Sequence, residues 1–93
     1  MTYTIENAKQ YKKSLRRYLK SGNFDLKKLD KVLSIISSGK NLEPKYRDHS
    51  LAGDFIGVRE CHIEPDLLLL YKIYKETEIL FLIDIGSHSE LFG

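Results

Sequence analysis

The first half of the chain carries apolar residues at spacings of three and four, the period of an amphipathic helix. Tyr11 and Leu15 follow this spacing, and Asn7 before them is a residue type that caps helices. The pattern predicts a helix from Asn7 to about Ser21, where the sequence SGN ends it. Just before it, the alternating residues 3–6, YTIE, predict a short strand.

A second helix is predicted from Asp25 to the stretch SSGK, where Gly39 is a typical stop. Its apolar residues repeat the helical spacing and are Leu26, Leu29, Val32, Leu33 and Ile36. Because few residues separate the two helices, we expect them to form an antiparallel hairpin.

The second half of the chain changes to strand-like patterns. Residues 40–54 are polar and contain proline and glycine, which predicts a long loop. Three strands are predicted at 55–63, 67–74 and 79–85, and KETE forms the turn between the last two. The run LLLLY in the second of them is typical of a strand that is buried on both faces.

The order strand, helix, helix, strand, strand, strand predicts an α+β fold. In it, the helical hairpin packs on one face of a small antiparallel sheet. The length of 93 residues predicts one domain over 1–93.

Charge is distributed unevenly along the chain. The 15 Lys and Arg residues exceed the 13 Asp and Glu residues by two, and most of the cations precede residue 48. This excess permits an anionic partner without requiring one, and it gives the first helix a basic outer face. No glycine-rich phosphate loop is present, which argues against a nucleotide-triphosphate enzyme.

Cys61 is the single cysteine, so an intramolecular disulfide is impossible, and we expect a small packed residue rather than a reactive thiolate. One cysteine suits a reducing compartment. No segment approaches the roughly 18 apolar residues of a membrane span. We therefore expect a cytoplasmic protein without a membrane partner.

The candidate chemistry lies in the histidines, all three of which fall at predicted element ends. His49 precedes the sheet, His62 is near the end of a strand, and His88 follows the last strand. Imidazole changes charge near neutral pH and therefore suits proton transfer. The alternative is that the three rings are ordinary exposed or hydrogen-bonded side chains.

A metal site is the less favoured interpretation. His62, Glu64 and Asp66 follow one another at steps of two and would share one face of a strand, but Pro65 interrupts that regularity. No Cys or His pair stands at a zinc spacing, and no cofactor is expected.

The sequence around the histidines resembles the YafQ type of bacterial toxin in the RelE/ParE superfamily. The stretches are YRDHSLAGDFIGVRECHIEPDLLLLYKI and GSHSELFG, with the motifs D-H-x-L-x-G, G-x-R-x-x-H-I-E-P-D and G-S-H-x-x-L-F. The sequence motifs resemble the family over roughly residues 42–93. In the first half, only the order of the predicted elements does. It implies the fold inferred above.

The resemblance also implies an activity and its partners. Such toxins are endoribonucleases that cut messenger RNA on the ribosome without a metal, using the 2′-hydroxyl of the RNA as the nucleophile. A cognate antitoxin neutralises them, and operator DNA is bound only through the antitoxin complex. For this chain, we expect an acidic or amphipathic antitoxin segment to cover the basic helical face.

By motif, the resemblance assigns the catalytic positions to His49, His62, Asp66, His88 and Phe92. Within that set, we expect His88 to be the acid, Asp66 or His49 the base, and His62 an orienting or charge-sharing group. Phe92 would stack on an RNA base.

Further cations are assigned to binding RNA or phosphate. Arg59 would stabilise the charged phosphorane, and Lys45 and Arg47 would bind phosphate. Arg59 and His62 are three residues apart, so they share a face only if a bulge or strand end intervenes. Glu64 is expected to be structural.

Two positions depart from the family. Ile56 stands where relatives often have a lysine, and Asp84 stands where an arginine is common. Both changes remove positive charge, which predicts a slow enzyme unless Lys45 and Arg47 substitute. A toxin of the ParE branch, which binds gyrase and cleaves nothing, is the main alternative function, and a nonspecific RNA-binding module is a third.

Overall fold

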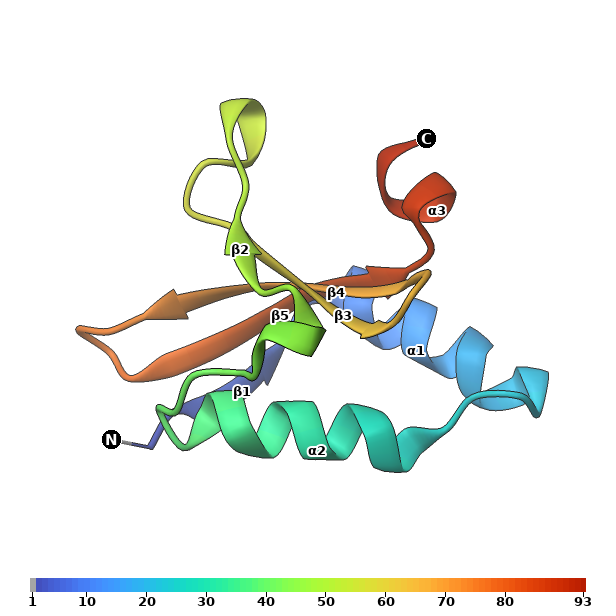
Figure 1. The fold of residues 1–93 in the computed structure, drawn as a ribbon, viewed down its shortest axis with the longest axis horizontal. Helices are drawn as coiled ribbons and strands as arrows, with labels where there is room; N and C mark the ends of the chain where they lie inside the picture. The colour runs from blue at the N-terminus through green and yellow to red at the C-terminus, as the bar shows by residue number, and fades with distance from the viewer. Residues whose placement is uncertain (1) are drawn as a thin grey trace.

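The computed structural model describes residues 2–93, which form a five-stranded sheet with two helices on one face (Figure 1). The elements in chain order are β1 (Thr4–Asn7), α1 (Lys9–Ser21), α2 (Leu26–Ser37), η1 (Pro44–Tyr46), β2 (His49–Ser50), η2 (Gly53–Phe55), β3 (Arg59–Glu64), β4 (Leu67–Tyr74), β5 (Ile79–Gly86) and α3 (His88–Phe92). The predicted α+β class with its helical hairpin is confirmed.

The sheet has the strand order β1-β5-β4-β3-β2 and is mixed rather than wholly antiparallel. β1 runs parallel to β5, while the other neighbours pair antiparallel. The parallel pair arises because the chain leaves β1 through both helices and the rest of the sheet before it returns as β5 beside β1. Sequence alternation gives the faces of a strand but not its direction.

Several predicted boundaries were wrong. The loop predicted at 40–54 contains η1 and the short edge strand β2, and the strand predicted at 55–63 begins only at Arg59. The helix α3 was not predicted because five residues are too few to show a periodic pattern. Asn7 belongs to β1, and Ala8 is the N-cap of α1, without a side-chain hydrogen bond.

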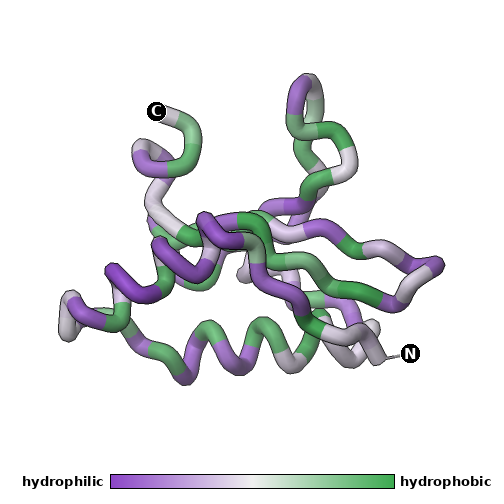
Figure 2. The backbone as a smooth tube through the Cα atoms, turned by 180° about the vertical axis from the view of Figure 1, so that it is seen from behind, coloured by the Kyte–Doolittle hydropathy of each residue, from purple (hydrophilic) through white to green (hydrophobic). Residues whose placement is uncertain are grey.

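The hydrophobic core lies between the sheet and the helical hairpin. Figure 2 shows α1 and α2 changing between hydrophilic and hydrophobic along each turn, as helices with one buried face do. Leu29 and Val32 of α2 meet Leu69 and Tyr71 of β4 in this core. All residues from Leu67 to Tyr71 are buried, which confirms that this part of β4 is covered on both faces.

Cys61 is fully buried in the same core, as predicted. Burial raises the pKa of its thiol, so the thiol stays protonated at neutral pH. None of the helices in residues 2–93 is long and apolar enough to cross a membrane.

The structure predicts a measurable role for Asp25, whose side chain accepts a hydrogen bond from the backbone N–H of Lys27 at 3.0 Å and caps α2. We expect Asp25→Ala to lower the free energy of unfolding by about 1 kcal/mol, measured by urea titration. Asp25→Asn keeps an accepting oxygen and is the control. An equal loss in both variants would contradict a capping role.

Candidate active site

The candidate site lies on the face of the sheet opposite the helical hairpin. The loop around η2 and the helix α3 both rise from this face, while α1 and α2 lie below it (Figure 1). Phe55 of η2 and Phe92 of α3 meet edge to face, with ring centroids 5.7 Å apart. The floor between these two projections is formed by the end of β3, which carries Glu60 and His62.

Glu60 is the centre of the polar cluster on this floor. Its side chain is only 7% exposed, and its carboxylate oxygen lies 3.3 Å from Nε2 of His62 and 3.6 Å from Nε2 of His49. The backbone explains both contacts. His49 is the register partner of Glu60 across the β2–β3 pair, and His62 is two residues further along the same strand face.

His88 joins the cluster from the start of α3. Asp66 Oδ1 accepts hydrogen bonds from the backbone N–H of His88 at 3.0 Å and from its Nδ1 at 2.7 Å. Because Nδ1 is engaged, Nε2 is the ring nitrogen left for chemistry. The ring centroids of His62 and His88 are 5.6 Å apart.

Asp66 is held in its charged form. The backbone hydrogen bond from His88, followed by the side-chain hydrogen bond from the same residue, lowers the pKa of the Asp66 carboxyl below its usual value. The group therefore stays ionised at neutral pH and remains an acceptor. It loses the contact with His88 only as the pH falls through this lowered pKa.

The helix α3 is positioned from outside the site by Glu90. The Glu90 side chain accepts from the backbone N–H of Ser87 at 2.8 Å, while Ser87 Oγ accepts from the Glu90 backbone, which completes a capping box. The same carboxylate accepts from Arg17 at 2.7 Å and from the Tyr18 hydroxyl, both on α1. Burial and the Glu90 contact raise the pKa of Tyr18 to about 12.

Arg59 is not brought to the histidines. It pairs with Asp48 at 3.2 Å, and its register partner Tyr71 belongs to the core on the helix side of the sheet. The β3 bulge lies between His62 and Glu64, beyond His62, so it does not turn Arg59 onto the same face. The structure therefore does not bring Arg59 together with the histidines, and its side chain instead pairs with Asp48.

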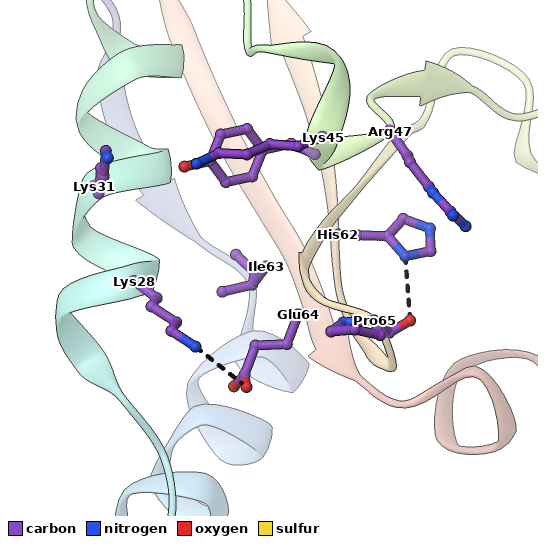
Figure 3. Close-up of a pocket in the computed structure, with 9 residues that line it drawn as sticks. Lys28, Lys31, Lys45, Arg47, His62, Ile63, Glu64 and Pro65 are labelled. Atoms are coloured by element: carbon purple, nitrogen blue, oxygen red, sulfur yellow. Dashed lines mark hydrogen bonds and ion pairs between the residues drawn. The ribbon is translucent and has the colours of Figure 1, made fainter.

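The remaining assigned residues lie around the cluster. Phe92 is 42% exposed beside Phe55, and Arg47 lies next to His62, with Lys45 nearby, along an adjoining cavity (Figure 3). Glu64 pairs with Lys28 of α2 at 3.5 Å, away from the histidines.

The two departures from the family fall in different places. Asp84 accepts a hydrogen bond from the buried Ser14 of α1 at 2.7 Å, so it helps to hold α1 against β5. Ile56 is 80% exposed in the η2 loop.

Glu60 was missed in the sequence, although a signal for it was present. A spacing of two, counted forward from His62, reaches Glu64 and Asp66, where the bulge and Pro65 end the alternation. Followed backward, the same spacing gives Glu60. A carboxylate two residues before a strand histidine, inside a regular strand, was the stronger candidate.

The cluster also contains a possible metal-binding set, but a different one from that considered in the sequence. One ligand atom from each of Glu60, His62 and His88 lies within 4.8 Å of the others. Two imidazoles and a carboxylate suit zinc, copper and nickel ions. The sequence set of His62, Glu64 and Asp66 does not converge, since Glu64 turns toward Lys28.

Known proteins resemble this chain in sequence and in fold. A family model described as "Bacterial toxin of type II toxin-antitoxin system, YafQ" matches residues 3–93. The mRNA interferase toxin YafQ of Escherichia coli K12 is 34% identical over 90 residues, which cover 96% of this chain and 95% of the relative.

Two solved structures extend the comparison. A metal-bound toxin from Helicobacter pylori has a TM-score of 0.89 and 48% identity, covering 99% of this chain and all of the other. The E. coli DinJ-YafQ toxin-antitoxin complex contains a chain with a TM-score of 0.89 and 32% identity, with both chains fully covered.

The contacts of Glu90 predict that α1 controls the order of α3. Tyr18→Phe removes one donor to Glu90, and we expect the amide hydrogens of Leu91 and Gly93, which bond within α3, to exchange about fivefold faster, the effect of losing about 1 kcal/mol. Hydrogen exchange followed by NMR measures this change. Tyr74→Phe on β4 is the matched control, and equal exchange in both variants would refute the link.

Proposed function

The chain belongs to the YafQ family of bacterial type II toxins, and from this premise we propose that it cuts messenger RNA on the ribosome by metal-independent acid–base catalysis. The toxin class and the mRNA interferase activity follow from the family, while the mechanism is our proposal. One observation carries it. The ring of His88 is oriented by Asp66, and one of its nitrogens lies within 4.8 Å of a ligand atom of Glu60 and of a ligand atom of His62.

The reaction requires an acid and a base on opposite sides of the scissile phosphate. The 2′-hydroxyl of the RNA loses its proton as its oxygen attacks the phosphorus, and the 5′-oxygen gains a proton as its bond to phosphorus breaks. Both proton transfers can be made by imidazole near neutral pH. The products are then a 2′,3′-cyclic phosphate and a 5′-hydroxyl.

We assign the acid to His88. In its protonated form the ring donates from Nδ1 to the Asp66 carboxylate at 2.7 Å, so the second proton is on Nε2, the nitrogen that is free to give it to the leaving oxygen. The ionised Asp66 favours this charged form and fixes the ring direction. Asp66 is therefore a positioning group rather than the base, because its Oδ1 is already occupied.

We assign the base to His49. Its Nδ1 lies 2.7 Å from the backbone carbonyl oxygen of Arg47, which can only accept, so Nδ1 carries the proton and neutral Nε2 presents a lone pair. The Glu60 oxygen 3.6 Å from that Nε2 stabilises the imidazolium that forms when His49 takes the proton.

We give His62 an orienting or charge-sharing role in the transition state, in the absence of Arg59. Its Nδ1 faces the carbonyl oxygen of Pro65 at 3.3 Å and its Nε2 faces Glu60 at 3.3 Å. Two polar partners on one ring hold its direction. Phe92, in contact with Phe55, offers a partly exposed ring on which an RNA base can stack.

The partners follow from the same premise. The relative in the DinJ-YafQ complex is bound to an antitoxin, and we propose an equivalent antitoxin for this chain. The outer face of α1, with Lys12, Lys13, Arg16 and Lys20, would meet an acidic segment of it. Operator DNA would be bound only through that complex, and ribosomal messenger RNA would place the reaction in the cytoplasm.

The gyrase-binding alternative is separated by one variant. We expect His88→Ala to lower mRNA cleavage by about 100-fold to 10,000-fold because the acid is removed, as measured by primer extension on a defined message with and without ribosomes. Thr77→Ala, in the distant β4–β5 turn, is the control for expression and folding.

Two outcomes of this experiment decide between the functions. Cuts that require ribosomes and disappear with His88→Ala support the proposed enzyme. An intact message with the wild-type protein, together with growth arrest that His88→Ala retains, would replace it with a toxin that acts by binding.

The metal-bound Helicobacter relative leads to a separate prediction about this site. Glu60, His62 and His88 could hold a zinc or copper ion, but coordination needs a deprotonated His88 nitrogen and would therefore remove the proton that His88 gives as the acid. We expect zinc to inhibit cleavage and a chelator to leave it unchanged, as measured by initial rates on a labelled message. Loss of activity with the chelator, restored by metal, would overturn the metal-independent mechanism.

A further inference from the structure

Beside the histidine cluster is a basic groove, and we propose that it binds the phosphodiester backbone of the RNA strand that the cluster cuts. The groove is the cavity of about 460 Å³ between α2 and β3 that is shown in Figure 3. Its polar wall consists of Lys28, Lys31, Lys45, Arg47, His62 and Glu64. This inference rests on the proposed function and adds a substrate-binding subsite to it.

The groove is continuous with the candidate active site because His62 belongs to both. His62 faces Glu60 on the floor of the site and also lines the groove, where Arg47 lies next to it (Figure 3). If the scissile phosphate of an RNA strand lies at His62, the neighbouring phosphates on the groove side of His62 come close to the cations of the groove. Lys28 and Lys31 are three residues apart on α2, so both reach the same side of that helix.

The charge of the groove is not balanced within the chain. Four cations face one carboxylate, Glu64, which pairs with Lys28 at 3.5 Å. Over residues 2–93, no ion pair is formed by Lys31, Lys45 or Arg47. Like charges around one cavity repel one another, and a polyanion that enters it removes that repulsion.

The backbone of Arg47 gives a second, independent reason. Arg47 has φ 49° and ψ 40°, a left-handed conformation that is costly for a residue with a side chain. Glycine would adopt the same turn at a lower cost, and the carbonyl oxygen that His49 contacts belongs to the backbone. What an arginine adds at this position is a guanidinium beside His62 (Figure 3).

The lining favours phosphate contacts over base recognition. Tyr46, the aromatic residue of the groove, is 9% exposed and lies in the core, with Lys45 Nζ 5.2 Å from its ring centroid. No free aromatic face is therefore offered to a base among the lining residues. Lysine and arginine contacts to phosphate give affinity that is independent of sequence and strongly dependent on salt.

The test uses an RNA oligonucleotide with a 2′-deoxy residue at the cut site, so that binding is measured without cleavage. We expect Lys31→Gln and Lys45→Gln each to weaken binding and to reduce the slope of log affinity against log salt by about 0.7, the value for one phosphate contact with a single strand. Lys12→Gln, on the outer face of α1, removes the same charge outside the groove and should leave the slope unchanged.

Two further variants separate a groove contact from general charge or misfolding. Glu64→Gln removes the carboxylate that competes for Lys28, so RNA affinity should rise. Arg47→Gly removes the cation and relieves the left-handed strain, so RNA affinity should fall while the melting temperature does not. Weaker binding in a variant of undiminished stability cannot come from unfolding.

Three outcomes would overturn the proposal. Equal slope changes for Lys12→Gln and Lys31→Gln would assign the effect to overall charge. Unchanged oligonucleotide binding together with weaker ribosome binding would assign the groove to ribosomal RNA. Unchanged binding to both RNAs with weaker antitoxin binding would assign it to the protein partner. Each is independent of whether the wild-type protein cleaves, because His88→Ala can be used as the background for all binding measurements.

Discussion

The buried carboxylate of Glu60 is the interaction on which the site depends. A charged group with 7% exposure is unfavourable unless it has polar partners, and its nearest ones are the imidazoles of His49 and His62. The contact between Glu60 and His49 also requires the two-residue strand β2, because the pairing of β2 with β3 sets His49 opposite Glu60. A strand this short has little stability of its own, so the histidine contact and the Arg59–Asp48 pair support the edge that carries His49.

The part of the site that carries His88 is likewise held by two other carboxylates, those of Asp66 and Glu90. The helix α3 has five residues, too few to be stable alone, and it is fastened by Asp66 at its first residue and by Glu90 to α1. His88 is therefore positioned by the turn before β4 and by α1 together. The helix α1 contributes no side chain to the histidine cluster. The catalytic geometry is a property of the packed domain rather than of any one segment.

The sequence allowed the regular elements and most of the site to be predicted because both depend on local patterns. The helices have a clear period, and His49, His62, Asp66 and His88 stand in specific motifs, although proximity of all four could not be derived from spacing. Whether Arg59 shares a face with His62 could not be predicted because it depends on where the bulge falls, which is a tertiary property. Glu60 was missed because only pairing with β2 makes it central, and β2 lies in a segment with no periodic signal.

The departures from the family can now be understood in physical terms. The carboxylate of Asp84 is not free, because it accepts hydrogen bonds from the Ser14 hydroxyl and from the backbone N–H of Ile85. Positive charge near the scissile phosphate must come from His62 and from the groove that His62 borders. His62 belongs to both the groove and the histidine cluster, so an anion bound in the groove lies beside that cluster. Under the proposed function, RNA binding in the groove and cleavage at the cluster are therefore coupled through His62, the residue that the two share.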